Sequence, residues 1–408
     1  MEKTENKNVF NIIANGVWGY EGLSGGDNIF INLGNHLQKY GFKVNVFSWK
    51  HGYLMSKKNG LKNVNYFLSE ADRFEKWPLL ILYFVRTWYG IKKVKQKVNC
   101  GLFKNKEAIV YSASDFLPDF LPALIFKKLV PNSFWIAGFY LFAPNPFRGY
   151  RSPFPKRIKF PDFRETLFWL SQKIIFKIIV KRADLICVTS QPDVAPFVNA
   201  GRKPEEIFVM KGGIDYPHLS KFQKPVKKIY DAVYVGRFHP QKGVVEMIDI
   251  WKKVVGKKPK AVLAVIGLGS MERKMRNKVK IYFLEKNVKF LGVKRGDDRN
   301  KFLQKSKIIL HPSVYDSGGM AAASGLACGL PGLCFDLPVF KTYYSKGFLR
   351  AEIDNFDDFA DKIVQLLDNA KLYESMKKEA IKEAESWDWG ERVNEFIKIM
   401  AKVKNGQD

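Results

Sequence analysis

Short apolar runs alternate with amphipathic stretches along most of this chain. The first run, 9–15 (VFNIIAN), leads into the glycine-rich stretch GVWGYEGLSGGDN, and a helical pattern follows from about residue 27 to residue 40. Gly41 ends this pattern, and the next apolar run is 43–49 (KVNVFSW). A strand, a glycine loop, a helix and a second strand in this order predict the opening of a parallel α/β sheet.

The same alternation continues in two series. Strands of the first are predicted at 108–112, 134–138, 185–189 and 207–210, and those of the second at 230–235, 261–266, 288–291, 308–310 and 332–335. Between the series, the segment 212–228 (GGIDYPHLSKFQKPVKK) is rich in Gly, Pro and Lys. A chain of 408 residues fits two domains of about 200 residues each. We therefore predict two Rossmann-like, doubly wound α/β domains in tandem, 1–215 and 216–387.

Charge, cysteine content and the N-terminal residues indicate the compartment of the protein and the kind of partner it binds. Lys and Arg outnumber Asp and Glu by 68 to 40, and the resulting net charge of +28 implies an anionic partner. The N-terminal stretch has no apolar signal core with a cleavage site. The longest apolar run, 79–85, is far shorter than the about 20 residues of a membrane-spanning helix. Four cysteines without a metal-binding spacing suit a reducing compartment, so we expect a cytoplasmic protein that does not cross a bilayer.

Two basic segments with interleaved apolar residues predict contact with an anionic bilayer. The first, 76–106, has no acidic residue, and its basic, aromatic and leucine side chains include Lys76, Arg86, Lys92, Lys93, Lys95, Lys97, Lys104, Lys106, Trp77, Leu79, Leu80, Tyr83, Phe84, Trp88 and Tyr89. In the second, 166–182, Lys173, Lys177 and Lys181 form a helical stripe beside Ile174, Ile175, Ile178 and Ile179. Such segments suit the headgroup region of an anionic membrane; the alternative is a buried helix with a solvated basic face. We expect the first domain to dock peripherally on the inner face of the cell membrane.

The loop after the strand 230–235 carries two cations. In the segment 234–243 (YVGRFHPQKG), the strand ends at Gly236, and Arg237 and Lys242 follow before a helix that begins near Val244. Cations at the carboxyl edge of a parallel sheet, beside a helix N-terminus, suit a diphosphate. The alternative is two solvated basic residues in a loop.

Two further loops of the second domain contain glycines after a strand. In 264–270 (AVIGLGS), Gly267 and Gly269 would let the backbone come close to a ligand, although glycine also serves purely steric needs in such turns. In 311–320 (HPSVYDSGGM), Asp316 precedes a glycine pair that opens a small-residue helix. The free amides there suit a sugar or phosphate oxygen, and Asp316 suits sugar hydroxyls, although a lone Asp at a helix start is usually a cap.

The succession VGRFHPQKG, VIGLGS, FLG and HPSVYDSGGMAAASGLACGLPG resembles glycosyltransferase family 4, the glycosyl transferases group 1. The resemblance covers about residues 228–340 and extends more loosely to the N-terminal glycine loop and to the closing SWDWGERV stretch. It implies a retaining enzyme of the GT-B architecture, with two Rossmann-like domains facing a cleft and no required metal. It further implies that the final helix, 388–408, packs back on the first domain.

Matching positions carry the family's site residues onto this chain. The phosphate-binding arginine and lysine fall on Arg237 and Lys242, and the first of two glutamates falls on Asp316; we expect these three to be catalytic. In the first domain, the loop glycines fall on Gly25 and Gly26. The other expected donor-binding residues are Gly236, Gly267, Gly269, Val293, Ser317, Gly318, Gly319, Met320 and Ser324.

The sequence departs from the family pattern at two of these positions. Ser324 stands in place of the second glutamate, which usually grips the ribose hydroxyls, and a serine makes only a weaker, neutral hydrogen bond. Tyr140, at the end of IAGFY, stands where the family often has an active-site histidine, and it is a candidate acceptor-side residue. With an ordinary pKa of about 10, a tyrosine is a poor base near pH 7. A mechanism in which the donor phosphate is the internal base, as proposed for the family, would tolerate this change.

We predict a metal-independent, retaining hexosyltransferase that takes its sugar from a UDP- or GDP-sugar. The acceptor is expected to be a membrane-associated glycan or a lipid-linked molecule of cell-surface polysaccharide or glycolipid synthesis. The alternative, which rests on Tyr140 and Ser324, is a donor-binding homologue of impaired activity that serves as a partner subunit of an active transferase. Nucleic acid is not an expected partner, because the charge is accompanied by no matching recognition motif.

Overall fold

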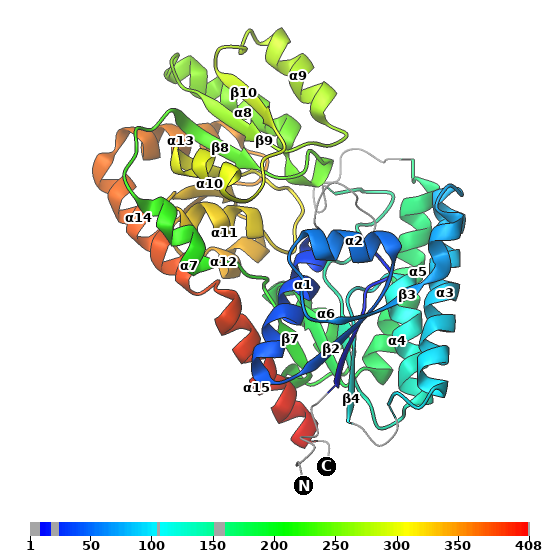
Figure 1. The fold of residues 1–408 in the computed structure, drawn as a ribbon. Coiled ribbons are helices and arrows are strands. Elements are labelled where there is room, and N and C mark those ends of the chain that lie inside the picture. The colour runs from blue at the N-terminus through cyan, green and yellow to red at the C-terminus, as the bar shows by residue number, and fades with distance from the viewer. Residues whose placement is uncertain (1–8, 18–23, 104–106, 151–159, 407–408) are drawn as a thin grey trace. The chain divides into compact units, whose positions relative to one another are not determined.

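Two parallel β-sheets organise the chain (Figure 1). The computed structural model describes residues 9–17, 24–103, 107–150 and 160–406. Contacts divide the chain into two units, which are described separately below. The first unit comprises Met1–Ala143, Asp162–Gly212 and Trp389–Asp408, and the second comprises Pro144–Pro161 and Gly213–Asp388.

The first unit is built on a seven-stranded sheet in the order β3-β2-β1-β4-β5-β6-β7. Every residue of the central strand β1 is buried, as expected for a parallel strand covered by helices on both faces. The strands are β1 (Val9–Ile13), β2 (Lys43–Trp49), β3 (Asn65–Ser69), β4 (Ala108–Ser112), β5 (Phe134–Gly138), β6 (Leu185–Val188) and β7 (Ile207–Val209). The helices are α1 (Gly25–Leu37), α2 (Lys50–Lys58), α3 (Leu79–Asn99), α4 (Leu117–Leu129), α5 (Phe163–Arg182), α6 (Val194–Asn199) and α15 (Trp389–Asn405).

Both ends of the described chain meet in this unit. Helix α1 begins with a capping box, in which the Ser24 hydroxyl accepts from the Asp27 N–H and the Asp27 carboxylate accepts from the Ser24 N–H. The last helix, α15, packs on α1, and its Phe396 ring contacts Phe10 of β1 and Phe208 of β7 at centroid distances of 6.3 and 5.7 Å. The final helix therefore belongs to the first unit.

The second unit is built on a six-stranded sheet in the order β10-β9-β8-β11-β12-β13. Its two faces are covered by different helices, and Trp251 and Trp387 are among the largest side chains of the two buried clusters that result. The strands are β8 (Tyr230–Val235), β9 (Leu263–Ile266), β10 (Val288–Gly292), β11 (Ser306–His311), β12 (Gly332–Phe335) and β13 (Phe348–Ala351). The helices are α7 (Tyr216–Leu219), α8 (Val244–Lys257), α9 (Glu272–Ile281), α10 (Gly296–Gln304), α11 (Met320–Ala327), α12 (Pro338–Tyr343), α13 (Phe356–Asp368) and α14 (Ala370–Glu385).

The predicted pair of Rossmann-like domains is confirmed, with three differences in detail. The edge strands β3 and β13 were not predicted: β3 is only partly buried, and β13 has four residues, so neither gives a long apolar run. The predicted boundary near residue 215 placed 144–161 with the first domain, whereas this segment groups with the second unit. Its Tyr150 ring contacts His239 and Tyr315 at centroid distances of 5.2 and 5.8 Å.

Among the described residues, every helix is too short or too polar to cross a bilayer.

Candidate functional site

Three loops meet at the carboxyl edge of the second sheet. Because β9, β8 and β11 are adjacent and parallel, the loops that follow them emerge side by side. Backbone hydrogen bonds join the first two loops, from Gly236 N to Ile266 O (3.0 Å) and from Phe238 N to Leu268 O (2.8 Å). The third loop is joined to the first, because Val314 N donates to Gln241 O at 2.9 Å. The motifs singled out in the sequence thus form one connected surface.

The glycines of these loops allow the backbones to approach closely. Gly267 and Gly269 have φ angles of +146° and +153°, which side chains rarely adopt. A Cβ on Gly267 would lie 1.9 Å from Gly236 O, and one on Gly269 would lie 2.5 Å from Phe238 O. The close packing of the loops is therefore sufficient to explain both glycines. That Gly267 and Gly269 also contact the sugar donor stays a prediction. Val293, which follows β10 at the same edge, is 43% exposed.

A buried ion pair joins the first and third loops. Lys242 Nζ lies 2.5 Å from Asp316 Oδ2, and the two side chains are 17% and 7% exposed. The same oxygen lies 3.3 Å from Nε2 of His311, while Asp316 Oδ1 accepts from the N–H groups of Ser317 and Gly318 at 3.0 and 3.2 Å. Burial acts to raise the pKa of Asp316, but Lys242 and His311 outweigh it and hold the pKa well below its usual range. Asp316 is therefore a carboxylate at neutral pH.

The predicted cations differ in their surroundings. Arg237 is exposed, and its guanidinium makes no hydrogen bond or ion pair with any residue of the described ranges. Lys242, by contrast, is held by Asp316.

His311 was not predicted as a site residue. The sequence signal that could have indicated it is a histidine at the end of an apolar strand, five residues before the aspartate. Its pKa is lowered, chiefly by burial, so a neutral imidazole faces Asp316.

The helix that follows Asp316 begins without a side-chain cap. Gly319 is the N-cap of α11 and provides no side-chain cap. A Cβ on Gly319 would lie 2.4 Å from Tyr344 Oη, and that hydroxyl donates to Gly319 O. Met320 is half-buried at the first position of α11, and one turn later Ser324 is buried, with its hydroxyl donating to Met320 O at 3.3 Å. The Ser324 hydroxyl is thus turned to its own helix backbone.

In the first unit, Gly26 and Tyr140 are in contact. Gly25 and Gly26 open α1, and a Cβ on Gly26 would lie 3.2 Å from the Tyr140 ring. Tyr140 is 9% exposed, and its hydroxyl forms a hydrogen bond with the hydroxyl of Tyr111. Burial raises the pKa of Tyr140 well above its ordinary value. Tyr140 is therefore an even poorer base than the sequence indicated.

A buried carboxyl group of the first unit was missed in the sequence. Asp119, in the first turn of α4, accepts from Gly16 N at 2.6 Å and from the Ser114 hydroxyl at 2.5 Å. These partners follow β1 and β4, so the group lies at the carboxyl edge of the first sheet. Burial raises its pKa to about 7. The signal was a lone aspartate in the apolar stretch FLPDFL.

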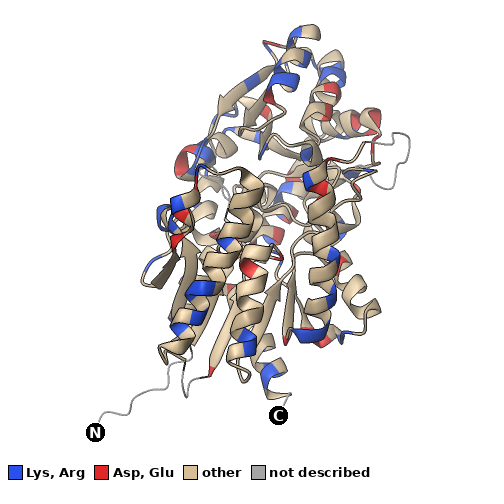
Figure 2. Cartoon of the chain, turned by 90° about the vertical axis from the view of Figure 1, so that its right-hand side faces the viewer, with Lys and Arg blue, Asp and Glu red and all other residues tan. Residues whose placement is uncertain are grey.

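The predicted membrane-facing helices are partly exposed and partly buried. Arg86 is fully buried, donates to Val17 O at 2.7 Å and lies 4.2 Å from the Trp49 ring centroid, so its assignment to the membrane face was wrong. Lys104 and Lys106 lie outside the described residues. The apolar side chains of this segment that are about half or more exposed are Trp77, Leu79, Ile81, Phe84 and Trp88. On α5, Ile175 and Ile179 are buried, whereas Ile174 is exposed beside Lys173 and Lys177. Lys and Arg lie along the long helices at the front of Figure 2.

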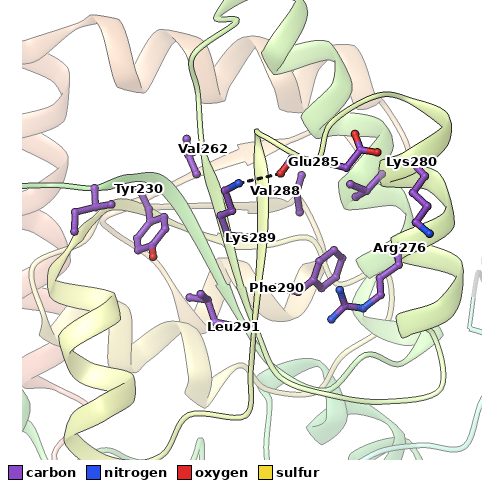
Figure 3. Close-up of a pocket in the computed structure, with 11 residues that line it drawn as sticks. Tyr230, Val262, Arg276, Lys280, Glu285, Val288, Lys289, Phe290 and Leu291 are labelled. Atoms are coloured by element: carbon purple, nitrogen blue, oxygen red, sulfur yellow. Dashed lines mark hydrogen bonds between the residues drawn. The ribbon is translucent and has the colours of Figure 1, made fainter.

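A hollow of about 640 Å³ lies elsewhere in the second unit (Figure 3). Its lining comes from the edge strand β10, from α9 and from residues at the starts of β8 and β9, and includes Val279, Val288, Phe290, Leu291, Arg276 and Lys280. None of the predicted site residues lines it. Within the described ranges, no three His, Cys, Asp or Glu side chains are grouped as metal ligands would be; that the reaction needs no metal stays a prediction.

Comparisons with known proteins agree with this geometry. The family model "Glycosyl transferases group 1" matches residues 217–383. The chain is 27% identical over 180 residues to an uncharacterized glycosyltransferase of Methanocaldococcus jannaschii, covering 43% of this chain and 48% of the relative. It is 23% identical over 226 residues to the phosphatidylinositol N-acetylglucosaminyltransferase gpi3 subunit of Schizosaccharomyces pombe, covering 54% and 50%. It is 25% identical over 205 residues to the poly(ribitol-phosphate) alpha-N-acetylglucosaminyltransferase of Staphylococcus aureus, covering 50% and 38%. The matched region thus spans about half or less of each of these three relatives.

Solved structures resemble the whole chain. Sucrose-phosphate synthase from Thermosynechococcus elongatus superposes with a TM-score of 0.72 at 14% identity, covering 98% of this chain and all of that one. HepE of Anabaena, solved in complex with UDP and glucose, superposes with a TM-score of 0.67 at 13% identity, covering 97% and 100%. At these identities, the likeness establishes the fold. The chain therefore has the GT-B fold, and its residues 217–383 match the family model of the glycosyl transferases group 1.

Proposed function

We propose that this chain is a retaining glycosyltransferase that moves a sugar from a nucleoside-diphosphate sugar to a membrane-associated glycan or lipid-linked acceptor. The observation that carries the proposal is the cation pair in the loop after β8. Arg237 is open to an anion, and Lys242 is held at the joined loops by Asp316. A diphosphate that enters this edge of the sheet meets one open cation, one positioned cation and the positive end of the α11 helix dipole, which has no side-chain cap.

These groups suit the chemistry of glycosyl transfer. As the bond between the anomeric carbon and the phosphate oxygen breaks, negative charge grows on the leaving diphosphate, and Arg237 and Lys242 stabilise it. The acceptor oxygen forms its bond to the anomeric carbon on the same face, and its proton passes to the leaving diphosphate. No side-chain base is needed, which agrees with the buried, hydrogen-bonded Tyr140. We expect Asp316 to orient Lys242 and to accept from the sugar once Lys242 turns to the phosphate.

The donor is proposed to be a UDP- or GDP-sugar. One structural relative was solved with UDP and glucose, which supports a uridine nucleotide without deciding between the two bases. By their names, two sequence relatives act on phosphatidylinositol and on poly(ribitol phosphate), both components of cell surfaces. These names support an acceptor that is lipid-linked or part of a surface glycan.

The exposed face of α3 supports an acceptor at a membrane. Ile81, Phe84 and Trp88 are 47%, 48% and 68% exposed, and their spacing of three and four residues places them on one stripe of the helix. The stripe continues into the exposed Lys92 and Lys95. An apolar stripe that passes into cations fits the interface of an anionic bilayer. We therefore propose that the first unit binds the membrane peripherally.

Product analysis tests the proposal. Purified chain is incubated with UDP- and GDP-sugars and with membrane lipids or surface glycan as acceptor, and released nucleotide and the anomeric configuration of the product are recorded. We expect a product that keeps the donor configuration, with loss of turnover in Arg237→Ala. The matched control is Lys260→Ala, an exposed cation of the same unit that lies outside the loops of the site. A product of inverted anomeric configuration would overturn the retaining mechanism. Equal activity of Arg237→Ala and Lys260→Ala would overturn the assignment of the donor site.

The second candidate is a donor-binding partner subunit without turnover of its own. The side chains of Ser324 and Tyr140 favour it, because both hydroxyls already have partners within the protein. Under this reading, the nucleotide sugar stabilises the fold but is neither hydrolysed nor transferred. Any transfer or slow hydrolysis that disappears in Arg237→Ala excludes it.

A further inference from the structure

The end of helix α9 presents two apolar side chains to solvent. Ile281 is 67% exposed and Phe283 is 86% exposed, and they flank the half-buried Tyr282. Leu284, the next residue, is buried. Neither Ile281 nor Phe283 is therefore needed for the core of the second unit.

The backbone at Phe283 is in the left-handed region, with a φ angle of +55°. Helix α9 closes there with hydrogen bonds from Phe283 N to Lys280 O (3.0 Å) and from Leu284 N to Val279 O (2.9 Å). Glycine or asparagine usually occupies this position, because a Cβ is strained in it. A large aromatic side chain that is both strained and exposed calls for a reason other than folding.

Cations surround the two exposed side chains. Within 273–289, the exposed basic residues are Arg273, Lys274, Arg276, Lys280, Lys286 and Lys289. The exposed acidic residue of this stretch is Glu285. Arg276 is paired with Glu272 at 2.8 Å, and Lys278, which is half-buried, is paired with Asp249. The corner thus combines an apolar tip with a strongly positive rim.

The lining of the hollow of Figure 3 includes Lys280 and Glu285, which flank the tip in the sequence. Its apolar lining includes Val279, Val288 and Phe290, and Arg276 lies with its guanidinium 4.2 Å from the Phe290 ring centroid. Lys280 and Lys289 also line it. A lining that combines apolar and cationic side chains suits the boundary between lipid chains and anionic headgroups.

We propose that this corner, residues 273–289 with the tip Ile281 and Phe283, docks on the surface of an anionic bilayer. The surface belongs to the second unit, whereas α3 and α5 belong to the first, and the proposal does not depend on the proposed transfer reaction. A second copy of this chain fits less well, because each copy carries a net charge of +28 and the two rims would repel.

The test uses the full chain and vesicles of phosphatidylcholine alone or mixed with phosphatidylglycerol. The variant Ile281→Asn/Phe283→Asn removes the tip, and asparagine suits the left-handed backbone at 283, so its melting temperature should stay equal or rise. The matched control is Val198→Asn, at a residue of α6 that is 37% exposed. We expect about tenfold weaker partition of the tip variant to anionic vesicles, and unchanged partition of the control.

A fluorescent label reports on the corner itself, whatever the first unit does. The label is placed by Asn277→Cys on α9, with Asn199→Cys on α6 as its control, both in a Cys100→Ser background that removes the exposed native thiol. We expect quenchers carried by anionic lipid to quench the label at 277 and to spare the label at 199.

Equal partition of the tip variant and the control, or vesicle binding without quenching at 277, would overturn the proposal. Self-association that the tip variant abolishes would overturn it as well, and would assign the corner to contacts between copies. A chain that binds no vesicles at all would overturn this proposal and the membrane part of the proposed function. Nucleotide-sugar binding is measured in the tip variant as well. If it persists while vesicle binding is lost, the loss concerns the docking corner and not the donor site.

Discussion

Lys242 Nζ lies 2.5 Å from Asp316 Oδ2, in an ion pair that joins the loop after β8 to the loop after β11. The sequence predicted that each residue contacts a bound donor. In the structure, the two side chains instead form an ion pair with each other. In the proposed function, a donor diphosphate would compete with Asp316 for Lys242, whereas it would meet the exposed Arg237 directly.

Removal of the Asp316 charge should destabilise the second unit. Asp316→Asn leaves the largely buried Lys242 ammonium without its counter-charge, so we expect the free energy of unfolding to fall by about 3 kcal/mol. Urea denaturation measures this. The control, Asp357→Asn, breaks the exposed pair with Lys253 and should cost less than about 1 kcal/mol. Equal losses in the free energy of unfolding would show that the buried ion pair contributes no more to stability than the exposed one.

Asp119 should make the first unit less stable as the pH rises from about 4 to about 7. Burial raises its pKa from 3.8 to about 7, so between these values the folded state binds more protons than the unfolded state. The free energy of unfolding then falls with rising pH, by up to about 4 kcal/mol for this group.

The variant Asp119→Asn should flatten this dependence, and Glu205→Gln, at an exposed residue of the same unit, should not. Chemical denaturation at half-unit pH steps measures the slope. A slope remains in Asp119→Asn, because burial also raises the pKa of Asp115 and Asp193 to about 6. Parallel curves for the parent and Asp119→Asn would contradict the prediction.

Gly267→Ala should separate the loops that follow β8 and β9. Its Cβ would lie 1.9 Å from Gly236 O at a φ angle of +146°, so we expect a loss of more than about 2 kcal/mol of stability. Gly256→Ala, within α8 and with open space around the new Cβ, should instead raise the stability by about 0.5–1 kcal/mol. Thermal unfolding compares the melting temperatures of the two variants. An unchanged melting temperature in Gly267→Ala would mean that Gly267 does not pack against Gly236.

Tyr140→Phe distinguishes a structural tyrosine from a catalytic base. The buried Tyr140 hydroxyl bonds to Tyr111, so we expect a loss of about 1–2 kcal/mol in stability and less than about a threefold change in kcat. Steady-state kinetics and unfolding curves report the two quantities separately. A fall in kcat of a hundredfold or more at unchanged stability would make Tyr140 part of the reaction.

Local patterns in the sequence were sufficient for the strands and for the loops that carry chemistry. The buried runs at β2, β4, β5, β8 and β12 were predicted with the observed bounds, because a continuous apolar run between turn residues marks a buried parallel strand. The helix start at Val244 was likewise predicted, since it follows a Pro and Gly loop.

Long-range partners could not be predicted in the same way. The burial of Arg86 depends on Trp49 and Val17, which lie far away in the chain, so its lysine-rich surroundings were misleading. The pairing of Lys242 with Asp316 spans 74 residues, and the contribution of His311 follows only from its burial next to them. The exposed tip at Phe283 depends on how α9 closes, which hydrophobic periodicity does not report.

Calorimetric titration with UDP- and GDP-sugars tests most directly whether the loop after β8 binds a donor diphosphate. We predict binding of one nucleotide class, at least tenfold weakened in Arg237→Ala and unchanged in Lys260→Ala. Binding that is equally strong in Arg237→Ala, or no binding of either class by the parent chain, would contradict the proposed donor site.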